Sequence, residues 1–543
     1  MPTSLLQYEM LPTTWFYVST LIILAIFFKF NRFFSVRNFD LSLLILISPG
    51  LILIAMDDSE FGYVWLFVVY FLFLIRLCFD TVMVRRPLLE PNLMPEALSF
   101  SCFFLFLFVL AALTVNRGNK IDTIRTVRLE HILTTRHLAQ KVGMNPATLT
   151  IPYKELPNIQ PGFRPFLSFC EHASLSFTPP PQIRAEMLQY KTDFSSWRRF
   201  FLSVNDSLNH ASSPTSINNN HISAADNPST PVKTVIENNN PATITPPPTI
   251  PQLTMLSENN ETINLSSTST TLPPRPVLLS EPEADISATV SPVEQVIQPP
   301  SLGQFCLFML IPILTQFMIV LGFIYVGHCH FGNIRTGVAC ATLYLLLPYT
   351  NQMVGRIDHI VPSAFILWGV AMYRRPFCAG ICIGSAAALV FYPLCLIPLW
   401  GSFYWRKGWV RFLIGTSSAI VLFSILLLFS PSTLGSYSEQ FLHMFGKSSL
   451  RVFSSADGFW NYHDIIYRVP LLACYFAVCF GMLLWPIHKH LAVLLSCSSI
   501  IMIGTQFWQL HQGGLYIAWF IPLLILTIFR PNLEDRVAQS TVI

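Results

Sequence analysis

Long apolar runs separated by short polar loops make up most of this chain. Four such runs precede residue 116: Trp15–Phe28, Leu41–Met56, Tyr63–Phe79 and Leu98–Val115. Eight follow residue 300: Phe305–Val326, Gly337–Pro348, Ile360–Tyr373, Phe377–Trp405, Val410–Phe429, Val469–Ile487, Leu491–Trp508 and Leu515–Phe529. Because lipid offers no hydrogen bonds to an open backbone, runs of this kind predict transmembrane helices. The sequence therefore predicts an all-α polytopic transmembrane helical bundle of about 11–13 hydrophobic segments.

The charges in the loops predict how the chain is oriented. Met1–Thr14 carry no Lys or Arg, whereas Lys29, Arg32 and Arg37 follow the first run, so we expect no cleavable signal peptide and an N-terminus outside. The acidic loop Asp57–Glu60 then falls outside and the basic loop at Arg85-Arg86 falls inside. We expect a multi-pass protein of the cell membrane.

The run Phe377–Trp405 is predicted to be a re-entrant hairpin. Arg374-Arg375 precede it and Arg406-Lys407 follow it, so a simple span would place one basic pair outside. Pro393 and Pro398 lie in its middle, where proline interrupts a helix. A hairpin that enters and returns keeps both basic pairs inside, and we favour it over a simple span.

A long polar insert separates the two membrane blocks, residues 1–115 and 301–530, and is predicted to be extracytoplasmic. Residues 116–202 mix apolar, aromatic and basic residues and predict an amphipathic extramembrane segment. Residues 203–300 are rich in Asn, Pro, Ser and Thr and predict a disordered linker, because they cannot bury enough apolar surface to offset backbone entropy. Residues 531–543 are expected to form a cytoplasmic tail.

Composition narrows the function. Only 11% of the 543 residues are charged and the net charge is +4, so we expect no nucleic-acid partner and membrane lipid as the surroundings. The sequence has no P-loop, Rossmann fingerprint or nucleophile elbow. His328-Cys329-His330 has the residue types of a metal site, but a loop beside a helix end is the favoured interpretation. We expect no cofactor, with a divalent metal left open.

One polar cluster lies between two apolar runs at the predicted outer face. The segment Tyr349–His359 contains Gln352, Arg356, Asp358 and His359. Ionisable groups at membrane depth are costly and therefore indicate function. The structural alternative is an ordinary polar loop with an Arg–Asp pair, in which the Asp358 carboxylate caps the first turn of the next helix.

A stripe of small residues follows this cluster, and on its own it predicts close helix packing. The residues that match a known pattern are Gly355-Arg356-Ile357-Asp358, Arg374-Arg375, Ala379-Gly380, Gly384, Ala386 and Pro393. Together, within Phe305–Arg411, they resemble the GT-C-type membrane glycosyltransferases, in particular the polyprenol-phosphate-mannose-dependent mannosyltransferases. That pattern has Gln where this chain has Arg356, and Lys where it has Val390.

The resemblance implies sugar transfer from a polyprenyl-phosphate donor at the outer membrane face. A carboxylate would deprotonate the acceptor hydroxyl and cations would stabilise the departing phosphate. Asp358 and His359 are the candidate catalytic residues, and Arg356, Gln352 and Tyr392 the candidate substrate-binding residues. The resemblance also implies an acidic residue in an outer loop, for which the candidates are Asp122, Glu130, Glu155, Glu171, Asp57 and Asp58.

Two other functions fit the same features. A broken hairpin next to an Arg-Asp-His cluster also suits a transporter or lipid flippase, although the two halves of the chain show no repeat. A non-catalytic membrane scaffold would explain the missing lysine at Val390.

Overall fold

The computed structural model describes the following residues: 12–55, 59–80, 90–115, 162–163, 165–167, 169–170, 302–405, 407–429, 437–446, 458–487, 489–510, 513–533 and 536–538. All of them lie in one compact unit, formed by residues 1–191 and 289–543. The second unit, residues 192–288, lies outside the described residues, as do the predicted linker and most of the predicted amphipathic segment.

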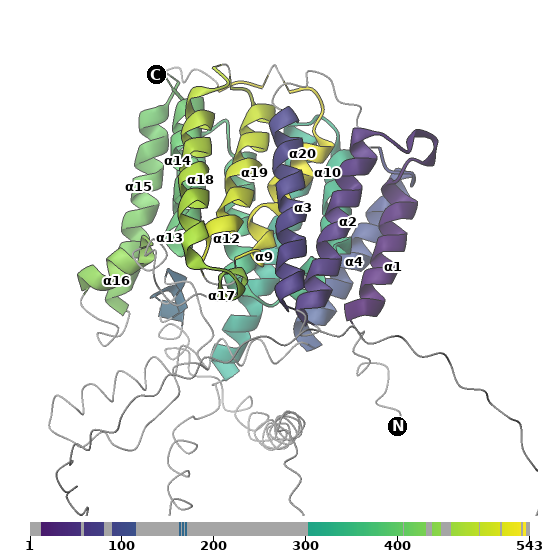
Figure 1. Cartoon of the computed structure of the whole chain (residues 1–543), viewed down its shortest axis with the longest axis horizontal. Helices are drawn as coiled ribbons and strands as arrows, with labels where there is room; N and C mark the ends of the chain where they lie inside the picture. The colour runs from purple at the N-terminus through teal and green to yellow at the C-terminus, as the bar shows by residue number, and fades with distance from the viewer. Residues whose placement is uncertain are drawn as a thin grey trace, which may run out of the picture. The chain divides into compact units, whose positions relative to one another are not determined.

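The described residues are helical and contain no sheet (Figure 1). The N-terminal elements are α1 Pro12–Phe27, η1 Phe30–Arg32, α2 Val36–Ala55, α3 Ser59–Asp80 and α4 Pro95–Val115. After the insert come α9 Leu302–Cys329, α10 Ile334–Leu346, α11 Pro348–Gln352, α12 Ile357–Ala371, α13 Pro376–Leu389, η4 Tyr392–Cys395 and α14 Leu396–Phe403. The remaining elements are α15 Trp409–Leu426, η5 Leu427–Phe429, α16 Tyr437–Met444, α17 Phe459–Tyr462, η7 Ile465–Tyr467, α18 Arg468–Leu484, α19 Leu491–Trp508, η8 Ile517–Trp519 and α20 Ile521–Phe529.

The predicted fold class is confirmed. Seven of the described helices are long and apolar enough to cross a membrane, and five shorter ones are also apolar. Each predicted apolar run holds a helix or, for Phe377–Trp405, a broken helix. The protein is therefore a multi-pass membrane protein.

The N-terminal and C-terminal membrane blocks pack together. Figure 1 shows α1–α4 beside α10 and α20. A buried ionic network links them: Arg76 lies 2.8 Å from Asp40 and 3.2 Å from Asp80, and Arg530 lies 2.7 Å from Asp80. Unpaired charges would be costly at this depth, so both blocks are needed to neutralise them.

Glycines allow α13 and α15 to approach closely. A Cβ at Gly384 would lie 2.6 Å from the carbonyl oxygen of Thr416, and a Cβ at Gly380 would clash with that of Phe412. Gly415 faces the Phe377 carbonyl in the same way. The small-residue stripe therefore serves helix packing, as its spacing predicts.

The region Phe377–Trp405 is a hairpin, as predicted. Helix α13 ends at Leu389, η4 and α14 return, and the Tyr404 hydroxyl at the far end donates to the Tyr373 carbonyl at 2.6 Å. The irregular turn at Val390 and Tyr392 is buried in protein, each residue being 1% exposed. Such backbone is tolerated at membrane depth only when it is covered in this way.

The loops divide between two ends of the bundle. At the end that we call the basic end, Lys29 bonds to Asn92, Arg335 bonds to the Leu93 carbonyl, and His330 bonds to the Ala371 carbonyl. Arg374 and Arg375 follow Ala371, so the hairpin places them at this end with Lys407. By the positive-inside rule, the basic end is predicted to face the cytoplasm. The opposite end, which carries α11, η4 and η8, is the site end.

The described part of the insert packs at the site end of α13. Phe163 and Leu167 are fully buried, and a Cβ at Gly162 would clash with the Ala388 carbonyl. Phe169 packs edge-on against Phe429 at 5.4 Å between ring centroids. The insert therefore contacts the membrane bundle directly next to the hairpin turn.

A candidate active site at the start of α12

The polar cluster of the site end is built around the first turn of α12. Helix α11 begins at Pro348, a residue suited to the first helical position, and α12 follows after a short turn with Arg356 as its N-cap residue. Asp358 and His359 are therefore helical, and they are 5% and 0% exposed. Two buried polar groups of this kind need partners, and each has them.

Arg356 is the partner of Asp358. Its Nη2 lies 3.0 Å from Oδ2 and its Nε lies 3.4 Å from Oδ1. The Arg356 side chain remains 28% exposed, so one side of the guanidinium faces outward. The N-cap residue is Arg356, and Asp358 lies in the first turn of α12, where a carboxylate interacts favourably with the helix dipole. The Arg–Asp pair of the structural alternative is present.

His359 is held in a single orientation. Its Nδ1 lies 2.6 Å from the Tyr349 hydroxyl, and its ring stacks on Tyr516 at 4.5 Å and 22°. Nε2 lies 3.7 Å from Asp358 Oδ2 and has no hydrogen-bond partner.

A proline exposes the backbone oxygen of Asp358 to a second element. Pro362 lies four residues after Asp358 inside α12 and has no N–H to donate to the Asp358 carbonyl. The Trp519 indole N–H donates to that carbonyl instead, at 3.1 Å. Because Pro362 leaves this carbonyl free, η8 is hydrogen-bonded to Asp358.

The turn before η8 is itself fixed by side chains from distant helices. The Gln506 Oε1 accepts hydrogen bonds from the backbone N–H groups of Gly514 and Tyr516, at 3.2 and 3.3 Å. The Tyr70 hydroxyl donates to the Gly514 carbonyl at 2.5 Å. Gly514 has a φ of +96°, which favours glycine there. This turn places Tyr516 against His359.

Tyr392 connects the hairpin turn to the same assembly. Its ring lies 5.3 Å from Trp519 and 5.2 Å from Trp508. Arg468 lies over Trp508 at 5.8 Å and donates from Nε to the Trp508 carbonyl at 2.6 Å. A continuous series of ring contacts thus extends from His359 of α12 through η8 and η4 to Trp508, where α18 begins and α19 ends.

The structure brings together most of the predicted site residues. Arg356, Asp358 and His359 are in direct contact, and Tyr392 reaches them through Trp519. Gln352, at the end of α11, is partly exposed and has no side-chain hydrogen bond to any of these four residues.

Three site residues were not predicted: Tyr349, Tyr516 and Trp519. Only Tyr349 lies in the same polar segment as Asp358. Two signals could have indicated the other two residues. Pro362, one turn after Asp358, leaves the Asp358 carbonyl without its helical donor, and Gly513-Gly514 mark a tight turn just before Tyr516.

The predicted acids of the outer loops lie outside the described residues: Asp57, Asp58, Asp122, Glu130, Glu155 and Glu171. Within the described ranges, no group of three or more His, Cys, Asp or Glu side chains could hold a metal ion. His328 and Cys329 end helix α9, and the His330 Nε2 donates to the Ala371 carbonyl at 2.7 Å, so this tripeptide closes a helix end.

Comparison with known proteins supports a glycosyltransferase. The model of glycosyltransferase family 87 matches residues 291–520, which include α9 to η8 and all of the site residues above. Neither the comparison with curated proteins nor that with solved structures gives a match. The family match and the apolar helices together support a membrane glycosyltransferase.

Proposed function

We propose that this protein transfers a sugar from a polyprenyl-phosphate donor at the site end of the bundle. The observation that carries the proposal is the buried Arg356–Asp358–His359 cluster inside the segment that matches glycosyltransferase family 87. A lipid-linked donor suits a site at the end of a membrane bundle, because its chain stays in lipid while its sugar reaches the protein.

Each residue of the cluster has a distinct role in this proposal. Arg356 is the partly exposed cation, and its planar guanidinium suits a phosphate oxygen. It therefore stabilises the charge that develops on the departing lipid phosphate. Asp358 orients Arg356, and His359 places its Nε2 beside the Asp358 carboxylate. The base that activates the acceptor hydroxyl is one of the outer-loop acids.

Buried polar atoms without protein partners support a hydroxyl-rich ligand at this end. Such atoms are rare in folded proteins, since each lost hydrogen bond costs about 1–3 kcal/mol. Within the described residues, the buried polar atoms of the site end without a partner include Asn351 Oδ1, His359 Nε2, Trp508 Nε1, Gln509 Oε1 and Gln509 Nε2. A sugar offers donors and acceptors for amide, imidazole and indole groups, and aromatic faces for packing.

Conservative substitutions test the proposal. Asp358→Asn keeps the shape of the side chain but removes the charge that holds Arg356, and Arg356→Gln removes the phosphate cation. Both variants should lower the content of glycosylated acceptor in cells at least about tenfold, the loss of one charged hydrogen bond of about 1.5–3 kcal/mol. Protein abundance is measured in parallel.

Arg411→Gln is the matched control, because Arg411 is an exposed arginine at the start of α15, near the basic end. Its content of glycosylated acceptor should equal that of the unmodified protein. Unchanged content in both Asp358→Asn and Arg356→Gln, at normal abundance, would reject the enzyme and favour the scaffold. Altered lipid transport without altered sugar transfer would favour the transporter or flippase.

A further inference from the structure

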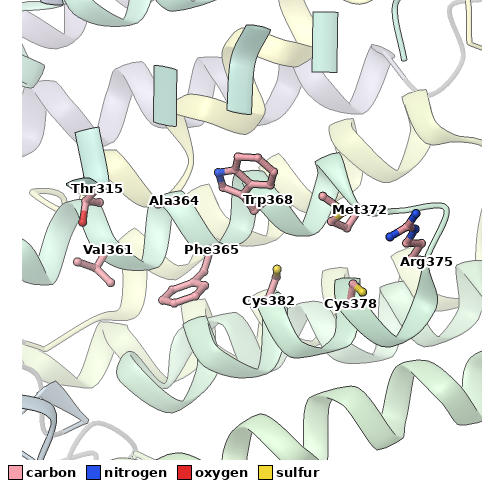
Figure 2. A pocket seen from close by; sticks show the side chains of 9 residues that line it. All are labelled: Thr315, Val361, Ala364, Phe365, Trp368, Met372, Arg375, Cys378 and Cys382. Carbon is pink, nitrogen blue, oxygen red and sulfur yellow. The ribbon is translucent and has the colours of Figure 1, made fainter. Parts of the chain in front are cut away.

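A groove opens between α9, α12 and α13, away from the polar cluster (Figure 2). Its volume is about 440 Å³, and it is lined by Thr315, Val361, Ala364, Phe365, Trp368, Met372, Arg375, Cys378 and Cys382. The Thr315 hydroxyl is bonded to the Ile311 carbonyl at 2.7 Å, so it offers little polarity. Arg375 is therefore the one charged group among the lining residues.

The groove runs along the length of α12. Val361, Phe365, Trp368 and Met372 recur every three or four residues, so they form one stripe of the helix. Figure 2 shows Val361 and Thr315 toward one end and Arg375 at the other. Eleven residues of helix correspond to about 16 Å, close to the thickness of one leaflet, half of a hydrocarbon core of about 30 Å.

Arg375 gives the groove a polarity. It lies at the basic end just before α13, it is exposed, and it has no ion pair with the described residues. Its neighbour Arg374 is engaged with the Tyr373 hydroxyl, at 3.3 Å from Nε. A guanidinium at the membrane surface above an apolar groove matches the layout of a phospholipid, with a phosphate at the interface and a chain below.

We propose that this groove binds an anionic phospholipid of the leaflet at the basic end, with its phosphate at Arg375 and one acyl chain along α12. The site is separate from the proposed sugar-transfer site. A polyprenyl donor would have its phosphate at the site end, beside Arg356, where this groove has no charged lining residue. The charge of the groove therefore favours the phospholipid as occupant.

Photo-crosslinking tests the proposal with the full-length chain. The protein is reconstituted in nanodiscs of phosphatidylcholine that contain a trace of phosphatidylglycerol or of phosphatidylcholine with a diazirine in one acyl chain. Phosphatidylglycerol should crosslink to peptides of α12 and α13. Arg375→Gln should reduce that yield about fivefold, the effect of about 1 kcal/mol for one basic residue at a membrane surface. Arg375→Lys should retain it.

Filling the groove gives a second test. Ala364→Trp should abolish crosslinking of both lipids to α12 and α13, because the indole occupies the chain position. Val421→Trp, on the exposed surface of α15, is the matched control and should change nothing. If the Ala364→Trp protein does not accumulate, the phosphatidylglycerol crosslinking yield of Arg375→Gln tests the proposal by itself. Equal phosphatidylglycerol yields from Arg375→Gln and the unmodified protein would overturn the proposal. So would groove crosslinks to a diazirine-labelled polyprenyl phosphate that Arg356→Gln abolishes and Arg375→Gln does not.

Discussion

The Trp519 indole N–H donates to the backbone carbonyl of Asp358 at 3.1 Å. In an uninterrupted helix that carbonyl would accept from the residue four positions later, which here is Pro362. The proline therefore creates an acceptor, and a tryptophan more than a hundred residues away along the chain satisfies it. The first turn of α12 is positioned by η8 through this one bond.

Trp519→Phe should lower sugar transfer at least about fivefold, because an unsatisfied buried acceptor costs about 1–3 kcal/mol and the turn that carries Asp358 loses its support. A phenyl ring replaces the indole, so aromatic contact with Tyr516 and Tyr392 is retained in part. The measurement is the content of glycosylated acceptor at equal abundance. Trp409→Phe, on an exposed tryptophan of α15, is the control. Full activity of Trp519→Phe would show that the bond does not position Asp358.

Tyr349→Phe should reduce transfer by removing a hydrogen bond that orients His359. Without the hydroxyl 2.6 Å from Nδ1, the imidazole ring is held in place only by its packing. His359→Gln removes the ring altogether. If the two residues act as one unit, Tyr349→Phe adds no further loss of transfer rate when it is combined with His359→Gln. A double-mutant cycle of transfer rates measures this coupling. Additive losses would mean that Tyr349 acts independently of His359.

Two glycine-to-alanine substitutions should have opposite effects on stability. A Cβ at Gly384 meets the Thr416 backbone, so Gly384→Ala should force α13 and α15 apart and destabilise by about 1–3 kcal/mol. A Cβ at Gly481 meets nothing within 4 Å, so Gly481→Ala should stabilise by about 0.5–1 kcal/mol through helix propensity. The thermal midpoint of the purified protein distinguishes them. If Gly384→Ala leaves the thermal midpoint unchanged, the close packing of α13 against α15 is contradicted.

Acid should destabilise the protein in part through His330. Burial lowers the pKa of His330 and the nearby Arg374 lowers it further, against the opposing effect of its bond to the Ala371 carbonyl. The unfolded chain therefore binds a proton at this residue below pH about 6.5 while the folded protein does not, so the free energy of unfolding falls as the pH falls through that value. The slope contributed by one such histidine is at most about 1.4 kcal/mol per pH unit.

His330→Gln should therefore flatten the decline of the thermal midpoint between pH 7.5 and pH 5.5, relative to the unmodified protein. The amide can still donate to the Ala371 carbonyl, which keeps the comparison close. His328→Gln, a change in the last turn of α9, is the control and should leave the decline as it was. An identical pH dependence in His330→Gln would exclude His330 as a source of the acid sensitivity.

Accessibility labelling tests the hairpin. Ser402 lies near the end of α14, next to the basic end, so Ser402→Cys should react with a membrane-impermeant thiol reagent only from the cytoplasmic side. Ser213→Cys, in the predicted extracytoplasmic linker, should react from outside. The unmodified protein gives the background from its native cysteines. Outside labelling of Ser402→Cys would reject the predicted orientation of the hairpin.

Much of the fold follows from the sequence because the bilayer imposes it. Apolar runs must become helices, and the paired basic clusters at Arg374-Arg375 and Lys407 require that the chain between them returns to the side from which it entered. The hairpin was predictable for that reason. The small residues from Gly380 to Gly384 likewise indicated close packing, although their partner, α15, could not be named from spacing alone.

The site was only half predictable. Arg356, Asp358 and His359 are adjacent in the sequence and conspicuous by their charge. Tyr516 and Trp519 lie more than 150 residues away, in a run that looks like an ordinary span, and only tertiary packing brings them to α12. The sequence did not show that Arg356 is the N-cap residue and that Asp358 stands in the first turn, because helix boundaries are the least reliable part of a sequence-based assignment.

The ion pair between Asp80 and Arg530 has a consequence for biogenesis. The two residues are 450 positions apart, so a ribosome completes α3 long before it adds the partner of Asp80. Until then Asp40 and Asp80 share the single guanidinium of Arg76, and the nascent N-terminal block carries an excess negative charge at a buried position. A chain truncated before Arg530 would keep that imbalance permanently, which offers membrane quality control a defined feature by which to recognise unfinished copies.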